Sequence, residues 1–197
     1  MANGEYNYNL SDFIVVMRNV ISKEECDKII NLYQGHSAWD WAGTVSGVDL
    51  NHRKVKQIYL SDTSVLGSSN EARMMDQNIF NVMSRVKDLY LKTLHKDRGV
   101  LHVPDIQRDE GYQLLHYSQG YYFKEHVDNF TGNSRVLTCT LNLNSGYEGG
   151  LFRFLSGEFD VSLGAGDAVM FPSNFMFPHE VTEITSGERY SIVTWFH

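Results

Sequence analysis

Three side chains in the second half of the sequence have the types and spacing of metal ligands. His126 and Asp128 are two positions apart in the segment KEHVD, and His179 follows in the segment PHEV. Residues two apart on a β-strand project from the same face, so this imidazole and this carboxylate would point together. Two imidazoles and one carboxylate on one face of Fe(II) leave positions open for a bidentate 2-oxo acid and O2. The set therefore predicts an oxygen-activating Fe(II) centre and not a structural zinc site.

A cation in a later segment supplies the context that an H-x-D pattern alone lacks. Arg189 begins the run RYSIVTWF, which has the composition of a buried strand. A buried guanidinium is costly unless it has an anionic partner, and the distal carboxylate of a 2-oxo acid would be such a partner. The alternatives are that Arg189 caps a strand end or pairs with a surface acid such as Glu188.

Two helices are predicted in the first half of the chain. Ser22 and Glu25 have the spacing of a capping box, and the apolar residues that follow predict an amphipathic helix over about 22–34. A second helix is predicted over roughly 70–94. Its apolar side consists of Met75, Ile79, Val82, Met83, Val86, Leu89 and Tyr90.

From Gly111 onward, short apolar or alternating runs are separated by Gly, Asn, Ser and Pro. This pattern is typical of an antiparallel sandwich or barrel. In the segment RVLTCTLNL, Thr138, Thr140 and Asn142 alternate with apolar residues and share one face of a strand. That face either lines an interior pocket or meets solvent, and periodicity alone favours solvent.

Three segments resemble the Fe(II)/2-oxoglutarate-dependent dioxygenases, and within them the prolyl 4-hydroxylase group. They are LLHYSQGYYFKEHVD, RVLTCTLNLNSGYEGGLFRF, and GDAVMFPS with PHEV and RYSIVTWF, and they span about residues 111–197. The resemblance implies an α+β, mainly β fold: a double-stranded β-helix, or jelly roll, with the N-terminal helices packed on one sheet. We expect a single dioxygenase domain over 1–197, in which 1–110 form a helical and strand support region and 111–197 the catalytic jelly-roll core.

The resemblance also implies roles for individual residues. The metal ligands would be His126, Asp128 and His179, Arg189 would bind the C5 carboxylate of 2-oxoglutarate, and no catalytic residue is needed beyond the metal centre. Tyr117 matches a cofactor-contacting tyrosine, with a packed core tyrosine as the competing interpretation. The remaining candidates are Thr140, Asn142 and Ser191 for a second contact to the C5 carboxylate, and Arg135 and Trp195 for the substrate. A surface charge at a strand start and a core tryptophan are the alternatives for the last two.

Two departures separate this chain from the collagen-type members of the group. Those members usually carry a G-G-E-T motif and a cofactor-binding lysine, where this chain has Gly149-Gly150-Leu151-Phe152 and Arg189. Both departures resemble the oxygen-sensing type, which instead has a tyrosine at the position of Asn142. This difference leaves the second contact to the C5 carboxylate open among the three candidates.

Composition bounds the class of protein and its partners. The 197 residues are 42% hydrophobic with a net charge of −7, which allows a full core and argues against nucleic acid as a partner. The basic cluster HRKVK at 52–56 is interpreted as a solvated strand edge or, alternatively, as a substrate-facing patch. No apolar run has the length of a transmembrane helix, and the first residues lack a signal-peptide pattern. With Cys26 and Cys139 expected to be free thiols, these features predict a cytoplasmic protein without a membrane partner.

The resemblance implies an enzyme, a 2-oxoglutarate-dependent dioxygenase of the prolyl 4-hydroxylase type. It would hydroxylate proline in a peptide or protein, with Fe(II) and 2-oxoglutarate as cofactors and O2 as co-substrate, and ascorbate is allowed as an addition. Succinate and CO2 would be released. The alternative is a hydroxylase of a free amino acid or small metabolite. A third hypothesis is a non-catalytic cupin-like binding domain, because jelly rolls host many functions.

Overall fold

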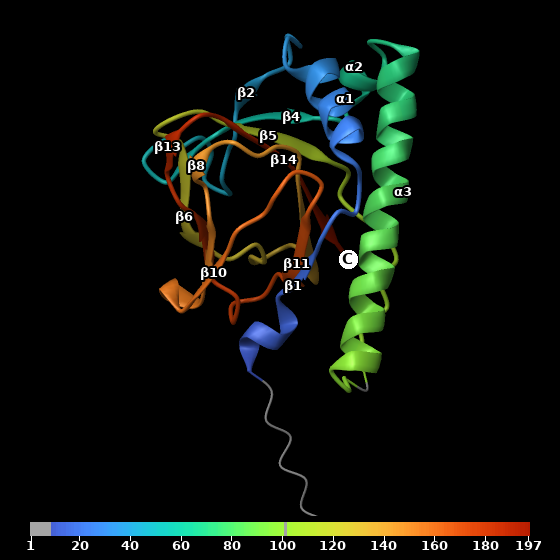
Figure 1. Cartoon of the computed structure of the whole chain (residues 1–197), viewed down its shortest axis with the longest axis vertical. Coiled ribbons are helices and arrows are strands. Elements are labelled where there is room, and N and C mark those ends of the chain that lie inside the picture. The colour runs from blue at the N-terminus through green and yellow to red at the C-terminus, as the bar shows by residue number, and fades with distance from the viewer. Residues whose placement is uncertain (1–8, 101) are drawn as a thin grey trace, which may run out of the picture.

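The computed structural model describes residues 9–100 and 102–197, which form two facing antiparallel β-sheets with helices along one side (Figure 1). Within this part, the larger sheet has the strand order β1 (Val15–Met17), β11 (Ala168–Pro172), β7 (Leu137–Asn142), β14 (Arg189–Phe196), β5 (Gln113–Tyr117), β4 (Lys56–Tyr59) and β2 (Asp40–Trp41). The smaller sheet has the order β10 (Phe159–Val161), β9 (Phe152–Phe154), β12 (His179–Val181), β6 (Tyr122–His126) and β3 (Arg53–Lys54). A separate ladder pairs β8 (Glu148–Gly149) with β13 (Ile184–Ser186). The predicted mainly β, α+β class is confirmed.

The first long helix begins at the predicted capping box. Helix α1 spans Lys23–Tyr33, and Ser22 Oγ accepts a hydrogen bond from Glu25 N at 3.2 Å while Ser22 N donates to Glu25 Oε2 at 2.8 Å. These reciprocal bonds satisfy two backbone donors at the helix end, which fixes where the helix begins. The other helical segments described are η1 (Leu10–Phe13), α2 (Thr63–Leu66), α3 (Asn70–Lys92), the π-helical turn η2 (Thr93–Asp97) and η3 (Leu155–Gly157).

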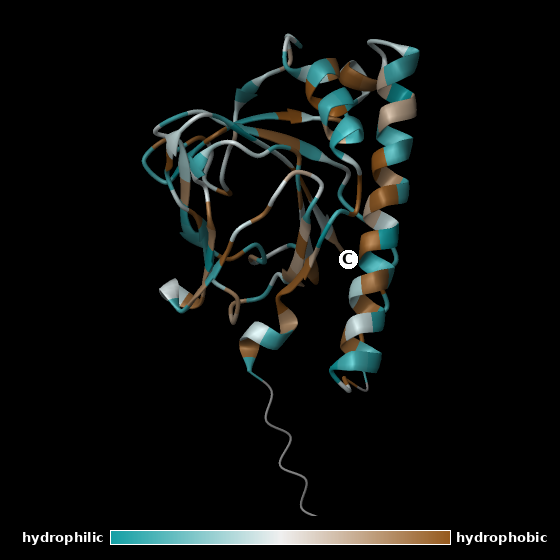
Figure 2. Cartoon of the chain, in the orientation of Figure 1, coloured by the Kyte–Doolittle hydropathy of each residue, from teal (hydrophilic) through white to brown (hydrophobic). Residues whose placement is uncertain are grey.

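Helix α3 packs along the outer side of the larger sheet (Figure 1). Polar and apolar residues alternate along it (Figure 2), and its buried stripe contains Ile79, Met83, Val86 and Tyr90. These side chains share a cluster with the outward-facing apolar residues of the larger sheet, and burial of each stabilises the fold by about 1.5–3 kcal/mol. Leu89 was predicted on the same side but is 44% exposed, because it falls at the edge of the stripe.

A second apolar cluster fills the space between the two sheets. Strand β7 separates the two clusters through its alternation: Leu137, Cys139 and Leu141 face the helices. The intervening Thr138 and Thr140 face the inter-sheet space and are 2% and 3% exposed. The polar face of this strand is therefore interior, and the solvent-facing alternative is wrong.

Strands that precede residue 111 extend both sheets. Strands β1, β2 and β4 join the larger sheet and β3 joins the smaller one, so this region contributes β-structure as well as helices. A single domain over 1–197 stays a prediction, and residues 1–8 and 101 lie outside the described part of the chain. No helix in the described residues combines the length and apolar character needed to cross a membrane.

Asp167 ties the N-terminal segment to the turn that precedes β11. Its carboxylate accepts hydrogen bonds from Arg18 Nη1 at 2.6 Å, Asn19 N at 3.0 Å and Gly164 N at 2.8 Å. Burial alone would raise the pKa of Asp167, but these donors lower it below its ordinary value. The ionised carboxylate therefore stabilises the folded state at neutral pH.

Candidate metal centre and cofactor pocket

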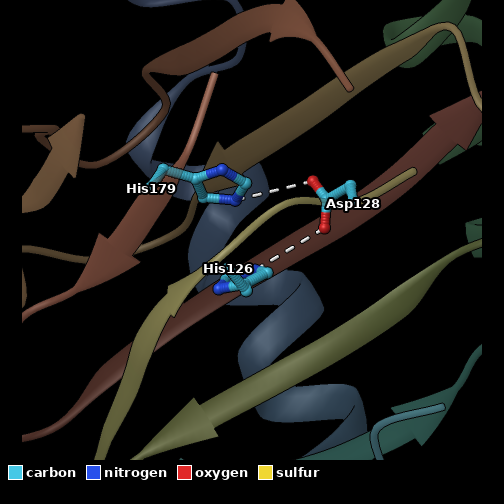
Figure 3. A group of neighbouring side chains, drawn as sticks. All are labelled: His126, Asp128 and His179. Atoms are coloured by element: carbon cyan, nitrogen blue, oxygen red, sulfur yellow. Dashed lines mark ion pairs between the residues drawn. The ribbon is translucent and has the colours of Figure 1, made fainter. Parts of the chain in front are cut away.

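Two neighbouring strands bring the three predicted metal ligands together (Figure 3). His126 ends β6, and His179 begins β12 directly opposite it in the ladder. Asp128 lies in the loop just after β6, so the expectation that a continuous strand carries both His126 and Asp128 is wrong. The ligand atoms of the three residues nevertheless lie within 4.8 Å of one another, with His126 Nε2 3.6 Å from Asp128 Oδ1 and His179 Nε2 3.5 Å from Asp128 Oδ2.

Backbone carbonyls orient both imidazoles. His126 Nδ1 lies 2.8 Å from Lys124 O, and His179 Nδ1 lies 3.1 Å from Phe177 O. A carbonyl oxygen can only accept, so each Nδ1 carries the proton and each Nε2 presents its lone pair toward Asp128. This arrangement is the one that metal-binding histidines use, because a bond to the second ring nitrogen fixes the tautomer and the ring orientation.

A hydrogen-bonded threonine holds the loop carboxylate. Thr138 Oγ1 donates to Asp128 Oδ2 at 2.7 Å, and Ser173 Oγ lies 2.9 Å from the same hydroxyl. Since the Thr138 proton is engaged with the carboxylate, Ser173 donates to Thr138. Sequence reasoning did not identify this support, because residues 128, 138 and 173 meet only in the folded chain.

The protonation states of the triad suit a cation. Burial alone would raise the pKa of Asp128, but His179, His126 and Thr138 together lower it well below its ordinary value. The pKa of His179 is lowered to about 4, first by burial and then by His126, while Asp128 and the bond to Phe177 O oppose the shift. At neutral pH the carboxylate is therefore ionised and His179 is neutral, which are the forms that bind a metal. Two imidazole nitrogens and one carboxylate oxygen on one side of a site match the facial triad of non-haem Fe(II).

Arg189 has the strongest unmet hydrogen-bonding demand near the triad. It is 1% exposed, its Nε donates to Asn142 Oδ1 at 3.0 Å, and both its Nη1 and its Nη2 are buried without a partner. The guanidinium carbon lies 5.2 Å from the ring centres of both Tyr117 and Phe152. No carboxylate of the described residues forms an ion pair with it, so the alternative pairing with Glu188 is wrong; Glu188 instead lies 3.3 Å from His116. Two free donors in a fork match a carboxylate in bidentate geometry.

The other predicted cofactor contacts divide into two groups. Tyr117, Thr140 and Ser191 line the same inner pocket as Arg189 and the triad, and Ser191 Oγ is buried without a partner. Burial raises the pKa of Tyr117 while Arg189 opposes the shift, so its phenol is neutral and can donate a hydrogen bond. Asn142 does not line this pocket. Its amide donates to Asn144 O at 2.7 Å and to two further carbonyls, while its oxygen accepts from Arg189 and Tyr147. Asn142 thus orients Arg189, and its direct contact with the cofactor stays a prediction.

The two predicted substrate residues lie at the outer cleft, which opens from the inner pocket. Arg135 Nη2 and Nε bind both carboxylate oxygens of Glu110, at 2.5 and 2.7 Å, and its Nη1 donates to Asp128 O at 3.2 Å. Its guanidinium carbon lies 3.7 Å from the ring centre of Trp195, whose Nε1 is buried without a partner. Arg135 is thus fixed by contacts just before β7, and its contact with the substrate stays a prediction. Its charge is already balanced by Glu110, and it steadies the loop that carries Asp128.

One residue of the basic cluster lies in the cleft, which was only the alternative interpretation of that cluster. Arg53 belongs to the basic cluster at 52–56, whose members were expected at a solvated strand edge, but its side chain is 8% exposed and lines both the inner pocket and the outer cleft. The signal was the alternation of Arg53, Val55 and Gln57, all buried, with the more exposed Lys54 and Lys56. The solvated-edge interpretation is wrong for Arg53, and Lys56 lies in β4, which pairs with strands on both sides.

Comparison with known proteins identifies the class. The profile of the 2OG-Fe(II) oxygenase superfamily matches residues 112–197, which contain the triad and Arg189. Residues 112–197 of the chain are therefore similar to the 2OG-Fe(II) oxygenase superfamily, which bears out the resemblance found in the sequence. The superfamily and the triad also confirm the predicted cofactor class, Fe(II) with 2-oxoglutarate.

The curated relatives that this chain resembles in sequence are PKHD-type hydroxylases. The chain is 26% identical over 195 residues to a PKHD-type hydroxylase of Shewanella oneidensis, covering 92% of this chain and 77% of the relative. It is 35% identical over 85 residues to one of Idiomarina loihiensis, covering 40% and 38%. The matches to several such relatives span only about two fifths or less of the relatives' length.

Solved structures establish the fold. A prolyl hydroxylase from Trichoplax adhaerens, in complex with a hypoxia inducible factor peptide fragment, has a TM-score of 0.72 at 20% identity and covers 94% of this chain and 84% of its own. A Pseudomonas putida prolyl-4-hydroxylase has a TM-score of 0.68 at 18% identity, with 94% and 92% covered. The predicted jelly-roll fold is confirmed.

Proposed function

We propose that this protein is an Fe(II)- and 2-oxoglutarate-dependent dioxygenase that hydroxylates proline in a peptide or protein. The observation that carries the proposal is the pair of buried, unpartnered Nη atoms of Arg189 beside the His126, Asp128 and His179 triad. A metal triad alone would serve many purposes. A triad next to an unsatisfied guanidinium fork calls for a ligand that combines a chelating end with a distal carboxylate, as 2-oxoglutarate does.

The triad residues would hold Fe(II) through two imidazole nitrogens and one carboxylate oxygen. Arg189 would bind the C5 carboxylate, with Tyr117, Thr140 and Ser191 as further donors around it. When bound, Fe(II) and 2-oxoglutarate supply the oxidation of a substrate C–H bond to an alcohol, with O2 consumed and succinate and CO2 released.

The rest of the chain would orient the substrate and keep water out. The walls of the inner pocket are largely apolar and include Leu115, Phe123, Phe152, Val181 and Val193. Such walls exclude water from the reacting centre and strengthen the interactions of the charged groups within it.

An outer cleft of about 530 Å³ supports a peptide or protein substrate over a small metabolite. Its mouth carries Val45, Val127 and Phe130, which are 74%, 36% and 38% exposed. Exposed apolar side chains around an open cleft are typical of a surface that binds another chain. Trp195, with its free Nε1, would donate to that chain. The cytoplasmic location stays a prediction, and the free, buried state of Cys26 and Cys139 supports it.

The test measures succinate and substrate mass together. The purified protein is incubated with Fe(II), 2-oxoglutarate and O2, with prolyl peptides blocked at both ends or with free L-proline. We expect peptides to raise succinate formation and to gain one oxygen atom. His126→Ala should abolish both signals, while His95→Ala, a matched change at an exposed histidine, should keep them.

Each alternative has its own outcome. Peptides that neither stimulate succinate formation nor gain oxygen would refute the prolyl substrate. Turnover with a free amino acid and no peptide would favour the small-metabolite hydroxylase. Absence of succinate under all conditions, despite bound metal, would favour the non-catalytic binding domain.

A further inference from the structure

A second buried cation lies in the cleft without an anionic partner. Arg53 is 8% exposed, its Nη1 donates to Gly43 O at 2.6 Å, and its Nε is buried with no hydrogen-bond partner. Its guanidinium carbon lies 4.7 Å from the ring centre of Phe123. Among residues 9–100 and 102–197, no carboxylate forms an ion pair with Arg53, whereas Arg18, Arg98, Arg135 and Arg153 each form at least one.

The surroundings do not neutralise this charge. Burial lowers the pKa of Arg53, with Tyr117 and Asp128 opposing the shift, yet an arginine remains protonated in proteins. The acid that opposes the shift, Asp128, forms no ion pair with Arg53; its carboxylate accepts a hydrogen bond from Thr138 and faces His126 and His179 in the triad. A buried charge without a partner is destabilising, so a structural role alone does not account for Arg53.

Arg53 occupies the junction between the metal triad and the exterior. It lines the inner pocket together with the triad and lines the outer cleft together with Gln113 and Trp195. Gln113 is 8% exposed with a free Oε1, and Trp195 is 5% exposed with a free Nε1. The substrate-facing end of the cleft thus offers a cation, a neutral donor and an acceptor, all of them unsatisfied.

We propose that Arg53 binds a carboxylate of the substrate, so that the substrate class is an anionic, carboxylate-bearing molecule. The inference rests on the proposed function, because it takes the triad as the reacting centre and Arg189 as the cofactor's anchor. The carboxylate could belong to an acidic side chain near the target residue of a peptide or to the α-carboxylate of a free amino acid. Both sources present the same planar pair of oxygens, which suits a guanidinium.

The experiment uses acetate as the carboxylate probe and acetamide as its neutral counterpart. The protein is labelled with 15N-arginine, loaded with diamagnetic Zn(II) and saturated with 2-oxoglutarate, so that the Arg189 site is filled. Acetate or acetamide is then added at constant ionic strength. We expect the Nε–H signal of Arg53, identified by its loss in Arg53→Met, to shift to saturation with acetate and to remain in place with acetamide.

The thermal stability of two variants tests acetate binding at Arg53 without its NMR signal. Acetate should raise the Tm of the loaded wild type and of Lys54→Met, which removes the adjacent charge outside the cleft. Arg53→Met should bind acetate on the order of 30-fold more weakly or worse, as expected when one partner of a buried charge pair is removed. Its ligand-free Tm should equal or exceed that of the wild type, which shows that the variant folds.

Competition assigns the source of the carboxylate. A blocked Asp-Pro-Ala peptide is compared with its Asn-Pro-Ala analogue, and L-proline with L-prolinamide, for displacement of acetate from Arg53. Preference for the Asp peptide over its Asn analogue indicates an acidic side chain, and preference for L-proline over its amide indicates an α-carboxylate.

Two results would overturn the inference. One is an Arg53 signal that acetate leaves unmoved. The other is an Arg53 signal that responds to acetate only when 2-oxoglutarate is absent, because Arg53 would then bind the cofactor. Failure of the proposed function is seen separately, as an Arg189 Nε–H signal that 2-oxoglutarate does not shift.

Discussion

Replacing Arg189 by Met tests the cofactor site most directly, because the change should affect binding and stability in different directions. Met keeps most of the side-chain length and removes the fork that would bind the C5 carboxylate. Loss of one partner of a buried, hydrogen-bonded charge pair costs about 2–5 kcal/mol, so 2-oxoglutarate affinity should fall by a factor of at least about 30.

The ligand-free protein should tolerate the same change. The wild type leaves two buried N–H-bearing atoms of Arg189 unpaired, and their removal relieves a desolvation cost. The variant loses the bond to Asn142 and the contacts with two aromatic rings, which are worth about 1 kcal/mol each. Asn142 Oδ1 keeps its bond from Tyr147. These terms oppose each other, so the free energy of unfolding should change by less than about 2 kcal/mol in either direction.

The assay is anaerobic titration of the Fe(II)-loaded protein with 2-oxoglutarate, followed by the weak visible charge-transfer band of the chelate, alongside urea unfolding of the ligand-free protein. Arg153→Met is the matched control, since Arg153 pairs with Asp160 and Glu180 on the surface. The control should bind 2-oxoglutarate like the wild type. The reasoning is refuted if Arg189→Met keeps its affinity within about threefold while its stability falls by about 3–5 kcal/mol, as for a purely structural buried pair.

Three further predictions follow from individual contacts. Thr138→Val removes the hydrogen bond to Asp128 at nearly constant volume, so metal affinity measured by calorimetry should fall about 10- to 100-fold; unchanged affinity would mean that the threonine does not support the ligand. Asp167→Asn should lower the free energy of unfolding by about 2 kcal/mol at pH 7. The pKa of Asp167 is lower in the folded state than in the unfolded state, so its stabilising effect is complete above the unfolded-state pKa and is lost as pH falls through the folded-state pKa. Urea unfolding at acidic pH should therefore show a smaller difference in stability between wild type and variant. A difference that grows at acidic pH would contradict the lowered pKa. Gly150→Ala would place a Cβ 2.6 Å from Ile184 Cδ1 and 3.2 Å from Arg189 Cδ, at a φ of +63°. The variant should therefore be destabilised by about 2 kcal/mol and should bind 2-oxoglutarate more weakly. Unchanged stability and unchanged binding would show that the backbone shifts freely at this position.

The sequence predicted features that depend on local pattern. The capping box at Ser22 and Glu25 located α1, because both partners lie within one helical turn. The alternation along 137–142 predicted which side chains would face a common direction. It did not reveal which face is interior, because both faces of this strand are buried, one under the helices and one between the sheets.

Local spacing could not reveal the partners that distant segments supply. Arg135 stays a predicted substrate contact, and Glu110, 25 residues earlier in the chain, holds its charge. Asn142 stays a candidate for the cofactor, and its amide is directed to the carbonyls of Leu163 and Gly164. Neither partner could be assigned from sequence, because the pairing depends on which loops the jelly roll brings to the same end of the sheets.

The sequence by itself determined the chemical types of the site: two imidazoles, a carboxylate and a cation in an order typical of the superfamily. The tertiary structure alone decided which charges are balanced and which remain free. Glu110 balances Arg135, while Arg189 and Arg53 are buried with donors to spare. The physical reason is that the charge of a side chain is a local property, whereas its burial and its partners are set by segments that meet only when the chain folds.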